Sequence, residues 1–290
     1  MTIESPPFRV RYAETDAQGV AYYGAYFTWH EVGEIHWLES QGLPLPQLQQ
    51  RGLILAVAES FTRFLRPAGY DEQLVARTRL AAAAPKRILF ENQIVRVADG
   101  QTLAVGRLAD VVLGPWGEVA SVPPELLAAA EERVEQVVVG ERAEELLAPT
   151  PRGAPQCTHD IKVRYAETDA QGVAYYGSHY EWFEAGRNEL TRSLGLPYSE
   201  LEARGTLLPV AEAYCRYLAP LGPCETFRMT TAVPRLTRAR ITFTNRMASV
   251  DGRRPIAAGY TVHGCTGRDG RPHGLPPEIV ERFAPRPDGQ

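Results

Sequence analysis

The chain has 290 residues, 44% of them hydrophobic, and a formal net charge of −4, which is typical of soluble globular proteins. The mild negative charge argues against a nucleic-acid partner, and no apolar run approaches the roughly 20 residues that a membrane-spanning helix needs. The first residues lack the basic and apolar segments of a signal peptide. The four cysteines all lie in the second half without zinc-ligand spacing, so we expect a reducing, cytoplasmic location and no bound metal.

The first predicted elements are a strand and a long helix. Residues 8–15 alternate and are rich in β-formers, which predicts a strand, and Asp16-Ala17-Gln18-Gly19 then breaks it. A helix follows from Tyr22 or Tyr23 to Gln41. One face of this helix carries Tyr22, Tyr26, Trp29, Gly33 and Trp37 at helical spacing. Glycine is costly inside a helix, by about 1 kcal/mol, so Gly33 indicates close packing against another element.

The remainder of the first half indicates an α+β protein. We expect a short helix at residues 45–51, a further helix opening at residues 123–125, and a charged, helix-prone segment at 131–147. Four strands are predicted between them, at residues 54–65, 73–82, 87–97 and 102–113. One long helix followed by a run of antiparallel strands is an α+β order rather than a βαβ order.

The second half repeats the first at an offset of 153 residues. Residues 10–24 read VRYAETDAQGVAYYG, and residues 163–177 are identical. A period this long indicates a duplicated domain, because solenoid repeats have periods of about 20–50 residues. A second long helix is predicted at 176–194, with Gly186 at the place of Gly33, and strands at 207–218, 225–233, 240–250 and 255–263. The proline-rich segment 149–155 reads as a linker, so we expect domains at 1–150 and 151–290.

The run Tyr12-x-Glu14-Thr15-Asp16-x-x-Gly19-Val20-x-Tyr22-Tyr23, followed by an aromatic helix, resembles the signature of hotdog-fold thioesterases. The 4-hydroxybenzoyl-CoA thioesterase group of acyl-CoA thioesterases is the most similar. The resemblance covers nearly all of both halves and implies two tandem hotdog domains, each a long central helix wrapped by an antiparallel sheet. It also implies that the two domains pair within one chain and that whole chains form homodimers.

Two departures from the family pattern concern residues near the helix start. Tyr23 and Tyr176 stand where many relatives carry histidine, although some carry tyrosine. Ala25 and Ser178 stand where many carry asparagine. Both copies of the carboxylate are kept, so the departures bear on substrate and subfamily.

The resemblance implies that Asp16 and Asp169 are the catalytic residues. Each carboxylate would act on the thioester carbonyl, either as a nucleophile or by activating water. Backbone N–H groups at the start of the helix, near Tyr23-Gly24 and Tyr176-Gly177, could hold the oxyanion. The alternative is structural, because an Asp before a glycine and a helix is often only an Asx turn or a cap.

Four glutamates are candidates for supporting roles. Glu14 and Glu167 would share a strand face with the Asp if the strand continues, where they raise its pKa, orient the loop or simply remain solvated. Glu59 and Glu212 lie in apolar strand segments and need a partner. They either position water at the site or pair with an arginine such as Arg63 or Arg216.

Basic residues near the third predicted strand of each half are candidates for the coenzyme A phosphates. They are Lys86 and Arg87 in the first half and Arg235, Arg238 and Arg240 in the second. The family often places basic residues there, and the planar guanidinium suits phosphate. The alternative is a solvated turn that carries ordinary charges.

These features favour an acyl-CoA thioesterase that needs no cofactor. A hotdog hydratase would pair the acid with a histidine, and no histidine lies within five residues after Asp16 or Asp169. An acyl-CoA-binding protein without turnover need not keep the carboxylate, which this chain keeps twice.

Overall fold

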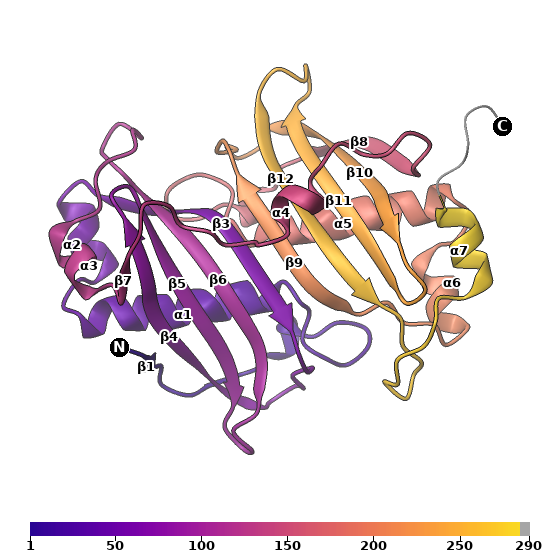
Figure 1. The fold of residues 1–290 in the computed structure, drawn as a ribbon, viewed down its shortest axis with the longest axis horizontal. Coiled ribbons are helices and arrows are strands. Elements are labelled where there is room, and N and C mark those ends of the chain that lie inside the picture. Colours follow the sequence, from indigo (N-terminus) through magenta and orange to yellow (C-terminus); the bar gives the residue numbers. More distant parts are fainter. Residues whose placement is uncertain (285–290) are drawn as a thin grey trace. The chain divides into compact units, whose positions relative to one another are not determined.

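The computed structural model describes residues 1–284. The chain divides into two compact units, Met1–Gly140 and Glu141–Gln290. Each unit contains one long helix and an antiparallel sheet, with short helices beyond the strands (Figure 1).

Unit 1 is built on a sheet in the order β1-β4-β5-β6-β3, in which neighbouring strands are antiparallel. Its strands are β1 (Ile3–Glu4), β2 (Phe8–Arg9), β3 (Ile54–Phe64), β4 (Gln73–Ala84), β5 (Arg87–Arg96), β6 (Thr102–Leu113) and β7 (Glu132–Arg133), of which β2 and β7 pair with β4. Its helices are the 3-10 turn η1 (Tyr12–Glu14), the long α1 (Ala25–Ser40), α2 (Leu45–Gln50) and α3 (Pro124–Ala129).

Unit 2 repeats this topology in the order β9-β12-β11-β10-β8. Its strands are β8 (Gln156–Lys162), β9 (Val210–Tyr217), β10 (Thr226–Leu236), β11 (Arg240–Ser249) and β12 (Pro255–Gly264). Its helices are α4 (Ala143–Leu146), the 3-10 turn η2 (Tyr165–Glu167), the long α5 (Ser178–Ser193), α6 (Tyr198–Ala203) and α7 (Pro277–Phe283). The predicted α+β order with antiparallel strands is therefore confirmed in both halves.

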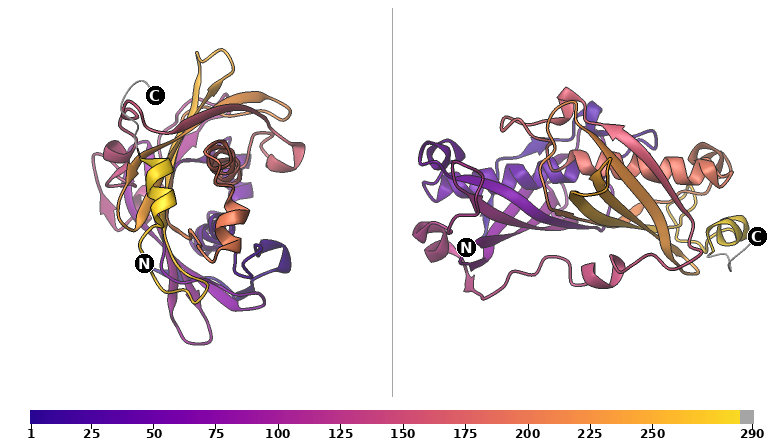
Figure 2. Two further views of the ribbon diagram at one scale, coloured as in Figure 1. Left: turned by 90° about the vertical axis from the view of Figure 1, so that its right-hand side faces the viewer. Right: turned by 90° about the horizontal axis from the view of Figure 1, so that it is seen from above.

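Each long helix packs closely against the strands of its own unit (Figure 2). A Cβ added at Gly33 of α1 would lie 2.2 Å from Thr78 Oγ1 and 2.8 Å from Ala76 Cβ, both on β4. A Cβ added at Gly186 of α5 would likewise lie 2.2 Å from Thr231 Oγ1. The expected close packing at both glycines is confirmed, because only a residue without a side chain fits there.

Two local predictions were wrong, and the first long helix starts two or three residues later than predicted. The strand expected at residues 8–15 ends at Arg9, and residues 12–14 form the turn η1 instead, because the Glu14 side chain bonds back to the amide of Arg11. The helix expected from Tyr22 or Tyr23 begins at Ala25, and of the helix-prone segment 131–147 only Ala143–Leu146 is helical.

Candidate active site

The loop that carries Asp16 is closed by backbone hydrogen bonds on both sides of the aspartate. The Asp16 amide donates to the Val20 carbonyl at 2.9 Å, and the Gly19 amide donates to the Asp16 carbonyl at 3.0 Å. Gly19 has φ of 78°, which a residue with a side chain adopts only with strain. The Gln18 amide donates to Asp16 Oδ1 at 2.8 Å. The Asx turn considered from the sequence therefore exists, and it fixes the orientation of the carboxylate.

Unit 2 builds the same loop with the same bonds. The Asp169 amide donates to Val173 at 2.9 Å, and Asp169 Oδ1 accepts from the Gln171 amide at 2.8 Å. Burial separates the two copies, since Asp16 is exposed and Asp169 is half-buried. The identical sequence thus gives two carboxylates of equal geometry in different surroundings.

Glu14 holds the Asp16 loop against the long helix. Its carboxylate accepts from the Arg11 amide and guanidinium, each at 2.7 Å, and from Trp29 Nε1 at 3.1 Å, while its carbonyl accepts from the Tyr22 amide at 2.8 Å. Burial acts to raise the pKa of Glu14, but the bonds from Arg11 and Trp29 outweigh it and hold the pKa below its usual value. Through these bonds Glu14 orients the loop that carries Asp16.

Glu167 makes the corresponding contacts in unit 2. It accepts from the Arg164 amide at 2.6 Å and from Trp182 Nε1 at 3.0 Å. Its carbonyl also accepts from Ser178 Oγ at 3.1 Å, a contact that Ala25 cannot make in unit 1. The loop in unit 2 therefore has one more hydrogen bond to its helix than the loop in unit 1.

The helix that follows each loop opens with a tight turn. The amides of Ala25 and Phe27 donate three residues back, to Tyr22 and Gly24, and are thereby engaged. An oxyanion would have to be held by amides that precede them, and Gly24 is the N-cap of α1, as Gly177 is of α5. The positive end of each helix dipole lies at this point.

Glu59 and Glu212 lie in the strands and form ion pairs. Glu59 Oε1 lies 3.0 Å from Arg87 Nη2, and Glu212 Oε2 lies 3.9 Å from Arg142 Nη1. The sequence suggested Arg63 and Arg216 as partners and did not suggest Arg87 or Arg142. The pairings with Arg87 and Arg142 depend on strand register and on the path of the chain before α4. Both glutamates are buried, with 8% and 9% of their surface exposed.

The basic residues proposed for the phosphates do not meet the aspartate of their own unit. The loop that carries Asp16 meets the chain just before β4, where Val20 pairs with Gly69, whereas Lys86 and Arg87 follow the end of β4. Twelve residues at about 3.3 Å each place roughly 36 Å between the two ends of that strand. In unit 2, Arg238 and Arg240 follow β10 in the same way, and Arg235 is paired with Glu145 at 2.5 Å.

A family model for the thioesterase-like superfamily matches residues 10–130 and 163–283. The chain belongs to the thioesterase-like superfamily. Each match begins at the repeated stretch and ends in the last helix of its unit, α7 in unit 2 and just past α3 in unit 1. The resemblance seen in the sequence is thereby confirmed, and thioester hydrolysis is the reaction class of this family.

Similar proteins agree with this assignment. The chain is 30% identical over 118 residues to the 1,4-dihydroxy-2-naphthoyl-CoA hydrolase of Thermosynechococcus vestitus, which covers 40% of this chain and 77% of that protein. It is 25% identical over 123 residues to the acyl-CoA thioester hydrolase YbgC of Escherichia coli, covering 42% and 92%. The solved 12:0-ACP thioesterase from Umbellularia californica has a TM-score of 0.72 at 11% identity, over 91% of this chain and 94% of that one. This last likeness shows the fold, in two repeated segments.

Residues 1–284 contain neither a cluster of metal-ligand side chains nor a membrane-spanning helix. In that part, no group of three or more His, Cys, Asp or Glu side chains could hold a metal ion. No helix described there is long and apolar enough to cross a membrane.

Unit 1 contains a buried polar layer that the sequence analysis missed. Asn92 Nδ2 donates to Glu34 Oε1 at 3.0 Å, and Thr78 Oγ1 donates to Asn92 Oδ1 at 2.6 Å. Burial raises the pKa of Glu34, and the neighbouring Asp110 raises it further; burial raises the pKa of Asp110 to about 7. His30, one helical turn before Glu34, is also buried, and burial lowers its pKa to about 3. The i, i+4 spacing of two polar residues among aromatic ones was the available signal.

Unit 2 has basic residues at the places of the two acids. At the 153-residue offset, Arg187 replaces Glu34 and His263 replaces Asp110, whereas Asn245 keeps the place of Asn92. Arg187 Nη1 lies 3.4 Å from His263 Nε2. The two halves are therefore identical in sequence at the aspartate loop, whereas the two acidic residues beneath the helix of unit 1 correspond to basic residues in unit 2.

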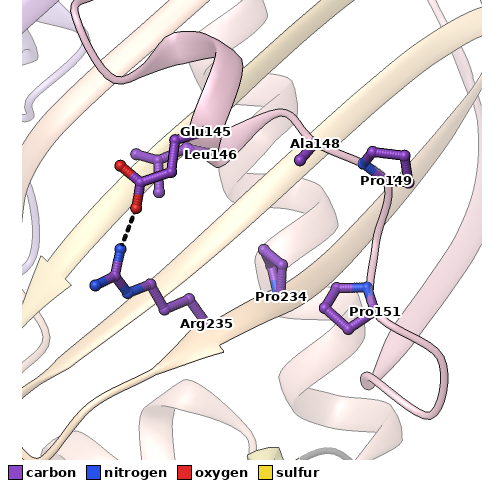
Figure 3. Close-up of a pocket in the computed structure, with 7 residues that line it drawn as sticks. All are labelled: Glu145, Leu146, Ala148, Pro149, Pro151, Pro234 and Arg235. Atoms are coloured by element: carbon purple, nitrogen blue, oxygen red, sulfur yellow. Dashed lines mark hydrogen bonds and ion pairs between the residues drawn. The ribbon is translucent and has the colours of Figure 1, made fainter.

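A groove lies between the segment 144–151 and the sheet of unit 2 (Figure 3). Its volume is about 250 Å³, and it is lined by Glu145, Leu146, Ala148, Pro149, Pro151, Pro234 and Arg235. The segment 144–151 is held by the ion pair of Glu144 with Arg216 at 2.7 Å and by Arg246, which donates to the Ala148 carbonyl at 3.1 Å. Arg235 therefore holds helix α4 against the sheet through Glu145 in this structure.

Proposed function

We propose that the protein is an acyl-CoA thioesterase with one Asp-dependent site in each half, residues 1–150 and 151–290. The observation that carries the proposal is the repeated loop, in which Asp16 and Asp169 are oriented by the same Asx turn just before the start of a long helix. Membership of the thioesterase-like superfamily supports the reaction class.

In the proposed reaction the carboxylate acts on the thioester carbonyl. As a general base, it removes a proton from water, which attacks the carbonyl carbon; the C–S bond then breaks, giving the free acid and the thiol of coenzyme A. As a nucleophile, it attacks that carbon itself and forms an anhydride, which water then hydrolyses. In both cases negative charge develops on the carbonyl oxygen, and amides near Tyr23-Gly24 and Tyr176-Gly177 would stabilise it.

The phosphates of coenzyme A are proposed to meet Lys86, Arg87, Arg238 and Arg240. Lys86, Arg238 and Arg240 are exposed at the hairpin turns. Arg235 and Arg87 are the weaker candidates because their ion pairs with Glu145 and Glu59 would have to open first. Since the hairpin and the aspartate of one unit lie at opposite ends of a strand, each phosphate site would serve the aspartate of another unit.

A phosphate site on one unit can serve the aspartate of another only if the units pair. We therefore also propose that the two hotdog units pair within one chain and that chains associate as homodimers. Sedimentation equilibrium would measure the association, and a monomeric chain with full activity would contradict the homodimer. We also propose a cytoplasmic location.

The proposal is tested by incubating the purified chain with a panel of aliphatic and aromatic acyl-CoAs and following thiol release with a chromogenic reagent. We expect thiol release with at least one member of the panel. Binding of acyl-CoA without thiol release would show a binding protein instead, and consumption of an enoyl-CoA without thiol release would show a hydratase.

A further inference from the structure

Arg187 is a buried cation without an acidic partner. Only 8% of its surface is exposed, and no Asp or Glu within residues 1–284 forms an ion pair with it. Burying a charge is costly unless it is paired and hydrogen-bonded. The guanidinium of Arg187 therefore lacks a negatively charged partner in the described part of unit 2.

His263 does not supply that charge. Its Nδ1 lies 2.8 Å from the Leu208 carbonyl, so Nδ1 carries the proton and Nε2 accepts from Arg187 and from Thr261 Oγ1, the latter at 2.9 Å. Burial and the positive charge of Arg187 lower the pKa of His263 well below its usual value. The imidazole is thus neutral, and it accepts only one of the five N–H bonds that a guanidinium offers.

Asn245 shows where the missing group would lie. Its Oδ1 accepts from Thr231 Oγ1 at 2.7 Å, as Asn92 accepts from Thr78 in unit 1. The Nδ2 of Asn92 is satisfied by the Glu34 carboxylate, whereas the Nδ2 of Asn245 is fully buried and has no partner in the described structure. Unit 2 therefore has the amide donor of Asn245 but no carboxylate on its own helix to accept from it.

We propose that unit 2 binds a carboxylate group between Arg187 and Asn245. One carboxylate oxygen takes the place of Glu34 Oε1 against the asparagine amide, and the other meets the guanidinium, which favours carboxylates through paired N–H bonds. Unit 1 binds none, because Glu34 and Asp110 occupy the equivalent space.

The position on the helix connects this site to the reaction, and this step rests on the proposed function. Arg187 lies ten residues beyond Gly177, which is about 15 Å along α5 at 1.5 Å per residue. An acyl group that lies along the helix from the thioester would bring a far-end carboxylate to Arg187. The bound carboxylate is either this end of a dicarboxylic acyl thioester or a free carboxylic acid.

Thermal unfolding of the full chain at constant ionic strength tests the site without any reaction. Sodium succinate and sodium hexanoate are titrated against sodium chloride as the reference. We expect carboxylate to raise the Tm of the wild-type chain, since a ligand that binds only the folded state stabilises it. Arg187→Met should weaken binding at least tenfold, and Arg192→Met, which removes an exposed arginine of the same helix, should not.

Asn245→Leu provides a second variant in case Arg187→Met fails to fold, and it should also weaken binding at least tenfold. Carboxylates that leave the wild-type Tm at its value in chloride, or that raise it equally in both site variants, would overturn the proposal. Glu34→Gln, made in unit 1, should leave the titration unchanged.

Hydrolysis then distinguishes the two sources of carboxylate. If the ligand is the end of the substrate, Arg187→Met should lower kcat/KM at least tenfold for a dicarboxylic acyl-CoA whose chain is long enough to span the distance of about 15 Å along α5, relative to the monocarboxylic acyl-CoA of the same length. An unchanged ratio with the Tm shift retained in the wild type would assign the site to a free carboxylate. Failure of the proposed function looks different, because no thioester would be hydrolysed while the Tm titration stayed intact.

Discussion

The indole of Trp29 donates a hydrogen bond to Glu14 at 3.1 Å, and this bond ties the long helix of unit 1 to the loop that carries Asp16. Trp182 and Glu167 repeat it in unit 2 at 3.0 Å. The position of each aspartate therefore depends on a contact between residues that lie fifteen apart in the sequence.

Replacing Trp29 by Phe removes the donor and keeps an aromatic ring. Because a hydrogen bond to a charged group contributes about 1.5–3 kcal/mol, we expect the free energy of unfolding to fall by about 2 kcal/mol in urea titrations. We also expect kcat of the first site to fall, measured in an Asp169→Asn background. Trp116→Phe, at a side chain that is 92% exposed, is the control. Lost stability with unchanged kcat would argue against a positioning role.

The paired aspartates predict a simple pattern of activity. Asp16→Asn should abolish one site, Asp169→Asn the other, and the double variant should lose at least a hundredfold in kcat, because asparagine retains the size but is neither a base nor a nucleophile. The remaining amides should leave some catalysis above the uncatalysed rate. Steady-state kinetics on the three variants measures this. Wild-type rates in a folded double variant would refute the aspartate mechanism.

The buried acids of unit 1 predict a loss of stability as pH rises. Burial raises the pKa of both Glu34 and Asp110, that of Asp110 to about 7, so the folded state binds more protons than the unfolded state between about pH 4 and 7. Stability from this pair is greatest below about pH 4 and declines through pH 7. Since one pKa unit corresponds to about 1.4 kcal/mol, we expect a decline on the order of 1–3 kcal/mol.

Urea unfolding from pH 5 to pH 8 measures this decline against a variant that removes it. Asp110→Asn should flatten the profile relative to the wild type. Glu39→Gln, at an exposed residue of helix α1, which also carries Glu34, should keep the wild-type slope. Parallel profiles for wild type and Asp110→Asn would contradict the assignment.

Gly33→Ala should destabilise unit 1 even though alanine favours helices. The new Cβ would lie 2.2 Å from Thr78 Oγ1, and forcing extra volume into a packed interface costs about 1–3 kcal/mol, more than the roughly 1 kcal/mol gained in helix propensity. Thermal and urea unfolding report the change. Gly264→Ala, where an added Cβ meets nothing within 4 Å, should be nearly neutral. A more stable Gly33→Ala would show that the helix can move away from the sheet.

Periodicity predicted the elements well where a pattern of side chains repeats. The four long strands of unit 1 lie within a few residues of their predicted positions, and the glycines at 33 and 186 correctly indicated helix–sheet contact. The strand predicted at 8–15 was wrong because the Arg11 amide donates to the Glu14 carboxylate, and this local bond overrides the alternation. A local sequence pattern cannot show whether the alternation of side chains or such a side-chain hydrogen bond decides the backbone conformation.

The site was predictable only in its local part. The Asx turn at Asp16 follows from neighbours in sequence, whereas the ion pair of Glu59 with Arg87 depends on the register between β3, β5 and β6. The contacts of Glu34 with Asn92, and the proximity of Asp110, join segments about 60 to 75 residues apart, and Arg187 was not singled out because an arginine on a helix is usually solvated.

The inverted charges beneath the two helices have a consequence for folding. The helices share their glycine and their loop, so each could dock on the sheet of the other unit. Such an exchange would place Arg187 beside Asp110 and Glu34 beside His263, which pairs acids with bases. Exchange of equivalent elements is a characteristic misfolding route of repeated domains. Here charge does not oppose such an exchange, so the buried charges by themselves do not assign each helix to its own sheet.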